Sequence, residues 1–316
     1  MSSTARIANG RTNNIPFNMP KILITGKQGQ VGFELRRSLA VLGDVVAVDR
    51  TQCDLSKPEM IRAVVRQVRP DIIVNPAAYT AVDKAESERE LAHAVNAVAP
   101  EVLAQEAAEL NALLVHYSTD YVFDGRKSTP YVEDDAANPQ SVYGQTKWAG
   151  EEAIRRHHKR HLIFRTSWVF GAHGNNFLKT ILRLARERDQ LKIVADQHGA
   201  PTPASLIADV TAQIISQYLR GQASAEFVYG TYHLSASGDT TWHGYAQAVL
   251  QQAMSRNIAL KVKPDAIEPI PTSAYPLPAP RPENSRLNTD KLRESFGLQL
   301  PPWHQGVEHV MTLLAH

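Results

Sequence analysis

Cysteine is almost absent from this sequence, with Cys53 the single example in 316 residues. One cysteine excludes an intrachain disulfide and a zinc site built from several cysteines, and it favours a reducing, cytoplasmic compartment. No apolar run reaches the roughly 18–20 residues that a membrane helix needs. Residues 1–18 also lack the apolar stretch of a signal peptide, so we expect no association with a membrane.

The chain has no large excess of charge either: 34 Lys and Arg face 32 Asp and Glu, a formal net charge of +2. That excess lies in residues 1–18, which contain Arg6 and Arg11 and no acidic residue. A neutral remainder carries no basic footprint, and we expect no nucleic acid partner. Residues 1–18 are polar and aperiodic, which predicts a mobile tail, with the ordered chain beginning at Met19.

Short apolar, β-rich runs alternate with longer helical patterns through the first half of the chain. The predicted strands are 21–25, 45–48, 71–75, 113–118 and 162–166. The predicted helices between and after them are 30–42, 57–68, 88–110 and 143–156. This βαβα alternation predicts the α/β class, with a doubly wound, parallel Rossmann-type sheet covered on both faces.

After residue 168 the alternation loosens, which predicts a smaller C-terminal domain interleaved with the end of the sheet. Helices are expected over 176–188, 205–219, 243–255, 288–296 and 305–314, and one more strand over 229–235. Residues 264–282 hold seven of the 19 prolines, so we expect an extended, irregular segment there.

A glycine-rich turn lies between the first predicted strand and the first predicted helix. Gly26 permits the tight turn, Gly29 lets the backbone approach a pyrophosphate, and Gly32 lets the helix pack on the strand. Asp49 ends the second strand 20 residues after Gly29, where an acid can bind the adenosine ribose. Glycines alone would mark only a tight turn, but together with the acid they predict a dinucleotide site.

The residues after the second strand leave the choice between NADH and NADPH open. The Asp49 carboxylate suits a free ribose 2′-hydroxyl, whereas Arg50 can pair with a 2′-phosphate or be simply a solvated charge. Asp54 and Leu55 follow on the same loop and are candidates to face the adenine. On this basis residues 19–168, with returning segments near 205–235, form the predicted NAD(P)-binding domain, and residues 169–204 and 236–316 the predicted substrate-binding region.

Tyr143 and Lys147 are four residues apart on a predicted helix, and so share one face. A tyrosine with a pKa near 10 is a poor acid at neutral pH, but a nearby ammonium lowers that pKa. Thr119 follows the fourth predicted strand, at the sheet edge where such folds bind ligands. The alternative for the Tyr143–Lys147 pair is a surface helix with an extended lysine. The alternative for Thr119 is an ordinary turn or helix cap.

Several motifs together resemble the extended short-chain dehydrogenase/reductases, and more narrowly the dTDP-4-dehydrorhamnose reductase family. They span residues 21 to about 310. The matching segments are Gly26–Gly32, Asn75–Asp83, His116–Asp124, Tyr143–Glu151, Phe164–Phe170, Gly174–Phe177, Asp196–Thr202 and Arg281–Asn288. The resemblance implies that the chain reduces the C4 ketone of dTDP-4-dehydro-β-L-rhamnose to dTDP-β-L-rhamnose with NAD(P)H, for the synthesis of cell-surface polysaccharide.

Roles for individual residues follow from the same resemblance. Tyr143 donates the proton to the C4 oxygen, and Lys147 holds the nicotinamide ribose and lowers the pKa of Tyr143. Thr119 polarises the ketone, Asp120 contacts the sugar and Trp168 packs beside it. Residues that surround the cofactor are Gly29, Gln30 and Val31 at the pyrophosphate, Asp49, Asp54 and Leu55 at the adenosine, and Ala78, Tyr79 and Thr80 after the third strand. Pro76 and Tyr79 depart from the family pattern.

The resemblance also implies Mg²⁺ at a contact between two copies of the chain, a homodimer, although no acidic cluster assigns its ligands. Two other functions remain open. One is a related sugar-nucleotide enzyme, such as a 4-ketoreductase giving the C4 epimer, an epimerase or a dehydratase; Tyr121 in place of Glu disfavours the dehydratase. The other is a non-catalytic NADP-binding subunit like the regulatory subunit of methionine adenosyltransferase.

Three other features have simpler interpretations. The basic run Arg155–His161 is predicted to be a solvated helix end. Trp148, Trp242 and Trp303 are expected in the core. Arg281 and Asn284 are candidates either to hold the nucleotide diphosphate or to stabilise a turn.

Overall fold

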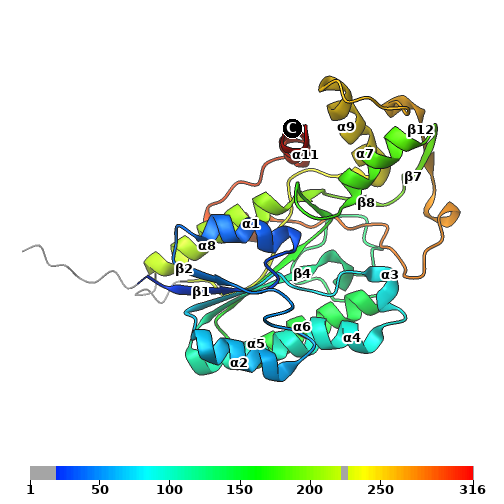
Figure 1. The fold of residues 1–316 in the computed structure, drawn as a ribbon. Coiled ribbons are helices and arrows are strands. Elements are labelled where there is room, and N and C mark those ends of the chain that lie inside the picture. Colours follow the sequence, from blue (N-terminus) through cyan, green and yellow to red (C-terminus); the bar gives the residue numbers. More distant parts are fainter. Residues whose placement is uncertain (1–18, 222–226, 316) are drawn as a thin grey trace, which may run out of the picture.

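A single parallel sheet organises the computed structural model, which describes residues 19–221 and 227–315; the expected tail at 1–18 lies outside these residues. Its six strands are β1 (Lys21–Ile24), β2 (Asp44–Ala47), β3 (Ile72–Asn75), β4 (Leu113–Thr119), β5 (His161–Thr166) and β10 (Gly230–His233). They lie in the order β10-β5-β4-β3-β1-β2, all parallel (Figure 1). The predicted doubly wound Rossmann-type sheet is therefore confirmed. The chain reverses its direction of winding between β1 and β3, so ligands are expected at the carboxyl end of β1.

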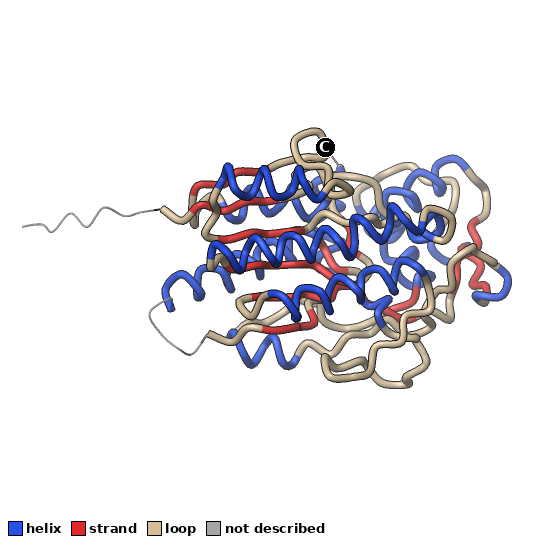
Figure 2. The backbone as a smooth tube through the Cα atoms, turned by 90° about the horizontal axis from the view of Figure 1, so that it is seen from below, coloured by secondary structure: helices blue, strands red, loops and turns tan. Residues whose placement is uncertain are grey.

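Helices cover both faces of the sheet, as Figures 1 and 2 show. One face carries α1 (Gln30–Leu39) and α8 (Ala204–Gly221), which pack on each other. The other carries α2 (Pro58–Val68), α5 (Ala99–Leu110) and α6 (Val142–His157). The central strands β3, β4 and β5 are buried along their whole length, because side chains on both sides of each strand face helices.

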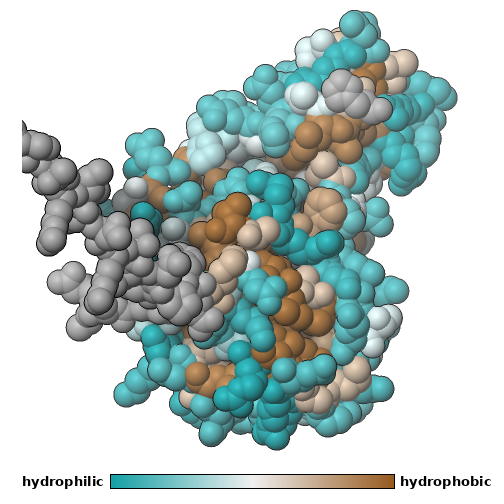
Figure 3. Space-filling model, turned by 60° about the vertical axis from the view of Figure 1, so that its left-hand side comes forward, coloured by the Kyte–Doolittle hydropathy of each residue, from teal (hydrophilic) through white to brown (hydrophobic). Residues whose placement is uncertain are grey.

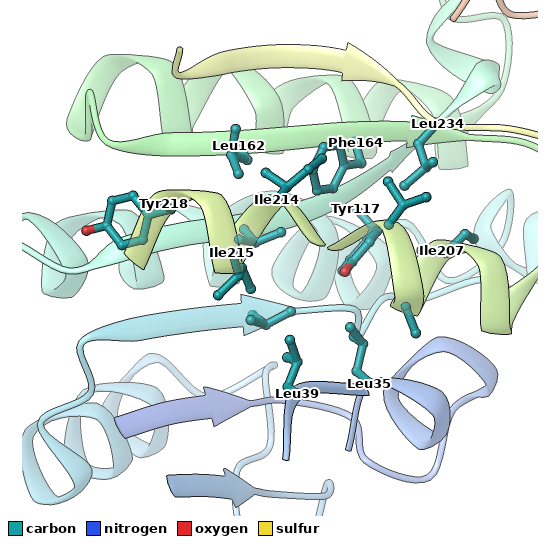
Figure 4. Close-up of a cluster of buried hydrophobic side chains, with 14 of the residues drawn as sticks. Leu35, Leu39, Tyr117, Leu162, Phe164, Ile207, Ile214, Ile215, Tyr218 and Leu234 are labelled. Carbon is teal, nitrogen blue, oxygen red and sulfur yellow. The ribbon is translucent and has the colours of Figure 1, made fainter. Parts of the chain in front are cut away.

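The core between the sheet and the α1/α8 layer is apolar and continuous (Figure 4). Leu35 and Leu39 of α1 and Ile214 of α8 lie close to the sheet residues Tyr117 and Phe164. All five are at most 6% exposed. Burying each such side chain stabilises the fold by roughly 1.5–3 kcal/mol, which fixes α1 and its N-terminal turn on the sheet.

The helix predicted over 88–110 is divided into three parts. These are α4 (Arg89–His93), the π-helical η1 (Ala94–Val98) and α5. Pro100 has no N–H to donate to the Asn96 carbonyl, and the backbone widens at that point into the π turn. The short helix α3 (Val82–Ala85) before it was not expected.

The second half builds a smaller lobe with its own core, which projects from the body that carries the sheet (Figures 1 and 3). Its elements are α7 (Phe177–Glu187), β7 (Leu191–Val194), α9 (Trp242–Ser255), β12 (Ile267–Ile270) and α11 (Trp303–Leu314). Two small pairs join it to the body: β6 (Val169–Phe170) with β9 (Thr202–Pro203), and β8 (His198–Gly199) with β11 (Thr240–Thr241). Figure 3 also shows a hydrophobic strip across the otherwise mainly hydrophilic face of the body.

The proline-rich segment 264–282 is more regular than expected. Residues 267–270 form β12, which pairs in parallel with β7 and places Ile267 opposite Leu191. Pro269 is tolerated because β12 lies at the edge of a two-stranded sheet. Two 3₁₀ turns, η3 (Pro264–Ala266) and η4 (Thr272–Ala274), flank the strand.

The placement of the helix α10 (Asp290–Phe296) differs from the predicted division of the chain. Leu292 and Phe296 belong to the core of the sheet and not to that of the smaller lobe, and Phe296 packs edge-on against Tyr232 of β10 at 5.0 Å. Residues 236–316 therefore contribute to both parts. The domain boundaries themselves stay a prediction.

The basic run Arg155–His161 is not simply a solvated helix end. Arg155 pairs with Glu151 and Glu152, and His158 is buried with its Nε2 2.8 Å from the carbonyl oxygen of Ala112. Arg156 and Lys159 are exposed, whereas Arg155, His158 and His161 are at least partly buried and hold the end of α6 against its neighbours. Among the described residues, no helix is long and apolar enough to span a membrane.

Candidate active site

The glycine-rich turn joins the end of β1 to the start of α1 at the predicted ligand edge. Gly26 has φ of +60°, a left-handed conformation that L side chains rarely adopt. A Cβ on Gly32 would lie 2.2 Å from the Gly26 carbonyl oxygen, so glycine is required where the helix crosses the turn. Gly29 caps α1 with no side-chain hydrogen bond. The first amides of the helix, including those of Gln30 and Val31, therefore point toward the position of an anion.

Asp49 lies directly beside this turn, just past β2. Its carboxylate accepts hydrogen bonds from Thr51 and lies 3.1 Å from the Lys27 ammonium. These two partners, Thr51 first, lower the pKa of Asp49 to about 2. A carboxylate that stays ionised at neutral pH is a good acceptor for ribose hydroxyls, and Lys27 places a positive charge next to it.

The other three residues predicted near the adenosine, Arg50, Asp54 and Leu55, have different surroundings. Arg50 is exposed, and its Nε lies 3.6 Å from the Asp54 carboxylate. Asp54 accepts hydrogen bonds from the N–H and hydroxyl of Ser56, which lower its pKa. Leu55 is only 7% exposed and packs in the core against α2. The Leu55 side chain therefore fills the core, and its place at the adenosine stays a prediction.

The segment after β3 is anchored to the π turn. The amide of Asn96 in η1 bonds to both the N–H and the carbonyl of Tyr79, at 2.8 and 3.1 Å. The Tyr79 hydroxyl donates to Glu88 at 2.6 Å. Ala78 and Thr80 flank this anchor. The π-helical turn at residues 94–98 therefore positions Asn96 to hold the loop after β3 in place. That loop lies at the edge of the sheet where ligands are expected.

Tyr143 and Thr119 meet at the carboxyl end of β4. Ser141 caps α6 by accepting from the Gly144 N–H at 3.2 Å, which places Tyr143 in the first turn of the helix. Burial raises the pKa of Tyr143 to about 12, a hydrogen bond with Thr119 opposes the rise, and the charge of Asp120 adds to it. The phenol is therefore protonated at neutral pH and equipped to donate a proton.

Lys147 lies one turn further along α6 and is 1% exposed. Its ammonium donates to the Tyr117 carbonyl at 2.6 Å and lies 3.2 Å from His116 Nε2. Burial lowers the pKa of Lys147 to about 8, and Glu151 opposes this. The expected lowering of the Tyr143 pKa by Lys147 is not what the structure gives, because the ammonium is bonded to β4 and burial dominates at the phenol.

A buried ion-pair network lies behind these residues and was not predicted from the sequence. Glu151 accepts hydrogen bonds from Ser118, from Arg155 and from Arg165, the last at 2.8 Å from Arg165 Nη2. Glu151 and Arg165 are 0% and 2% exposed. The arginines hold the pKa of Glu151 below its usual value against the effect of burial. The continuation of the Tyr143–Lys147 spacing by four residues to Glu151 was the signal available in the sequence.

Tyr121, just after β4, lines a cavity of about 230 Å³, and Asp120 before it is buried. Burial raises the pKa of Asp120 to about 6, while the Ser285 and Thr119 hydroxyls favour the carboxylate. Tyr121 packs edge-on against Tyr143, with 5.5 Å between ring centroids. The cavity lining includes Tyr121, Ser141 and Arg281, so the cavity lies beside the first turn of α6, where Tyr121 packs on Tyr143.

Arg281 and Asn284 have different surroundings. Arg281 Nη2 lies 2.7 Å from Asp83, which leaves the guanidinium at the cavity wall. The Asn284 amide donates to the Lys127 and Thr129 carbonyls at 2.6 and 2.8 Å, so Asn284 stabilises a turn.

Trp168 marks the passage from the sheet to the smaller lobe. It has φ of +48°, which is unusual for so bulky a residue. Its ring stacks on Trp242 with centroids 3.7 Å apart, and Gly199 leaves room for the indole. Trp242 and Trp303 are partly buried in the core of the lobe, and Trp148 packs on the Phe123 cluster. No group of three or more His, Cys, Asp and Glu side chains that could hold a metal occurs among the described residues.

This fold and these side chains define a class, the Rossmann-type oxidoreductases of the extended short-chain dehydrogenase/reductase kind. A family model described as RmlD substrate binding domain matches residues 20–315. The chain belongs to this family, and curated relatives that it matches at 38–52% identity carry the name dTDP-4-dehydrorhamnose reductase.

Two curated relatives illustrate the similarity in sequence. The dTDP-4-dehydrorhamnose reductase of Shigella flexneri is 51% identical over 297 residues, covering 93% of this chain and 97% of that protein. The reductase of Salmonella typhimurium is 52% identical over 295 residues, covering 92% and 97%.

Solved structures give the same result. A dTDP-4-dehydrorhamnose reductase from Clostridium acetobutylicum superposes with a TM-score of 0.84 at 34% identity, covering 94% of this chain and 100% of that one. A second, from Bacillus anthracis in complex with NADP, gives 0.83 at 34% identity, covering 93% and 99%.

Proposed function

We propose that this chain is an NAD(P)H-dependent reductase that converts dTDP-4-dehydro-β-L-rhamnose to dTDP-β-L-rhamnose, in the synthesis of rhamnose-containing polysaccharide. The observation that carries the proposal is the meeting of Thr119 and Tyr143 at the sheet edge that also bears the glycine-rich turn. The curated relatives with this name cover nearly the whole chain.

The residues present fit a nicotinamide dinucleotide. Gly26 and Gly32 leave no room for a Cβ, and the α1 amides suit the pyrophosphate. Asp49 suits the adenosine ribose, and Lys27 beside it offers a positive charge to a 2′-phosphate. This pairing favours tolerance of both NADH and NADPH. When bound, the reduced cofactor supplies the hydride.

Each catalytic residue then has a task that its surroundings support. The Thr119 hydroxyl polarises the C4 ketone, and Tyr143, which is protonated at neutral pH, delivers the proton to the C4 oxygen. Lys147 offers an ammonium to the nicotinamide ribose, on the same helix face. Asp120 and Trp168 bound the sugar, and Arg281 stands at the cavity wall for the nucleotide diphosphate.

A coupled assay tests the proposal. The sugar nucleotide is made in place by the upstream dehydratase and epimerase, consumption of NAD(P)H is followed by absorbance, and the product is identified by NMR. We expect oxidation of the cofactor and the rhamno configuration at C4. The C4 epimer as product would establish the related 4-ketoreductase, and cofactor binding without turnover would establish the non-catalytic alternative.

Tyr143→Phe tests the assigned proton donor. We expect kcat to fall by roughly 10²–10⁴-fold with cofactor binding retained. Tyr232→Phe is a matched control, because Tyr232 is also buried, but its hydroxyl donates to the Val228 carbonyl just before β10, at the edge of the sheet. Full activity of Tyr143→Phe would refute the assignment. The homodimer, its Mg²⁺ and the cytoplasmic location stay predictions, which sedimentation with and without chelator and fractionation of cells would test.

A further inference from the structure

A chain of buried polar side chains runs beneath the site, across three strands, and ends at Lys147. The Thr25 hydroxyl lies 2.5 Å from Asn75 Oδ1, the Asn75 amide nitrogen 3.1 Å from His116 Nδ1, and His116 Nε2 3.2 Å from Lys147 Nζ. Each of the four residues is 1% exposed. Because β1, β3 and β4 are adjacent and parallel, these groups meet at one edge of the sheet.

The donors and acceptors along this chain of polar side chains determine which atom carries each proton. Burial and the nearby Lys147 lower the pKa of His116 well below its usual value, so the imidazole is neutral. An ammonium only donates, so Nε2 must accept from Lys147 and Nδ1 must carry the proton. That proton needs an acceptor. With Lys147 charged, the Asn75 amide must therefore turn its oxygen to His116 and its nitrogen to Thr25, the reverse of the orientation shown by the distances above. The two ends of an amide are assigned from such networks, and the orientation shown is the one that a neutral Lys147 would take.

A neutral Lys147 would reverse every bond. The His116 proton would move to Nε2 and be donated to the amine, and Nδ1 would accept from the Asn75 amide nitrogen. The tautomer of His116 thus reports the charge on Lys147.

We propose that Thr25, Asn75 and His116 form a positioning chain that holds the Lys147 ammonium in place and favours its charged form. This inference rests on the proposed function, in which Lys147 acts as a cation at the ribose. His116 touches neither substrate nor cofactor in this scheme and acts only through Lys147.

Other charged and polar groups lie on the elements packed around Lys147. On its own helix are Tyr143 and Glu151, the latter neutralised by Arg165 of β5. Asp120 follows β4, and η1 contributes the neutral amide of Asn96, which donates to Thr146. Glu151 favours the ammonium by its charge, and His116 favours it by accepting its hydrogen bond.

Two variants and one spectrum test the proposal. NMR of ¹⁵N-histidine-labelled protein at pH 6.5 or so should show His116 as the Nδ1–H tautomer. His116→Phe should lower kcat roughly tenfold, leave the KM of the sugar nucleotide within about twofold, and move the alkaline limb of the pH–rate profile to lower pH. Asn75→Asp keeps an acceptor for Nδ1–H and adds a negative charge, so the limb should move to higher pH.

His158→Phe is the matched control, because His158 is also buried and bonded, but to the Ala112 carbonyl at the other end of α6. It should keep the wild-type pH profile. If His116→Phe does not fold, Asn75→Asp carries the kinetic test. An Nε2–H tautomer at that pH, or an unchanged alkaline limb in a folded variant, would overturn the proposal. Failure of the wild-type protein to oxidise NAD(P)H would instead refute the proposed function, and the tautomer would still test the chain.

Discussion

Replacing Gly32 with alanine tests whether the contact between α1 and the turn is as tight as the geometry states. The added Cβ would lie 2.2 Å from the Gly26 carbonyl oxygen and 2.9 Å from its carbon. Contacts under 3.0 Å are essentially never seen, so helix and turn must separate by at least 0.8 Å. The obstacle is backbone, and Gly26 is already in the left-handed region, so neither side can yield by a side-chain rotation.

The magnitude follows from two opposing effects. Overpacking costs about 1–3 kcal/mol, and the better helix propensity of alanine returns up to about 1 kcal/mol. We expect the free energy of unfolding to fall by about 1–2 kcal/mol, which lowers Tm by roughly 2–4 °C per kcal/mol. The α1 amides shift away from the pyrophosphate position, and KM for NAD(P)H should rise roughly tenfold to hundredfold.

Replacing Gly29 with alanine tests the approach of the cofactor phosphate to the backbone separately from the packing of α1 on the turn. Gly29 has φ of −73°, and its Cβ would lie an ordinary 3.4 Å from the nearest atom. Its stability by urea denaturation should stay within about 0.5 kcal/mol of wild type, while KM for the cofactor rises because a methyl group projects where backbone should meet phosphate. Wild-type stability and KM in Gly32→Ala would refute the packing argument, and a wild-type KM in Gly29→Ala would refute the assigned phosphate position.

Three further predictions concern buried charge and the cavity. Glu151→Ala leaves Arg165 buried without its partner and should lower the free energy of unfolding by about 3–5 kcal/mol. The control Arg183→Ala, in an exposed pair, should change that free energy by less than about 1 kcal/mol. Equal effects of the two variants in urea denaturation would contradict this prediction. The raised pKa of Asp120, about 6 against 3.8, means that the folded state binds more protons between these values, so its contribution to stability falls as pH rises from about 4 to 6, by up to about 3 kcal/mol. Asp120→Asn should remove that dependence, and its persistence in the variant would show another group to be responsible. Arg281→Ala should raise KM for the sugar nucleotide and leave KM for NAD(P)H unchanged; the opposite pattern would move the cavity to the cofactor side.

Polar residues within apolar runs were the sequence signal that went unused. Thr25 and Asn75 each end a predicted strand, and His116 interrupts another. Periodicity located all three strands, but it did not show that the polar residues would meet, because strand order is a tertiary property: β1 and β3 are neighbours although β2 lies between them in the chain. The pairing of Glu151 with Arg165 could not be predicted either, because it depends on the packing of α6 against β5.

The sequence by itself determined the parallel sheet, the glycine-rich turn and the Tyr143–Lys147 face, since each depends on local spacing: two residues per strand repeat, 3.6 per helical turn, and glycine where a Cβ cannot fit. The absence of surplus charge and of cysteine excluded other classes from composition alone. Tertiary structure decided what the spacing could not, namely the pKa values. Burial raised that of Tyr143 and lowered that of Lys147, because desolvation depends on what packs around a group and not on its neighbours in the chain.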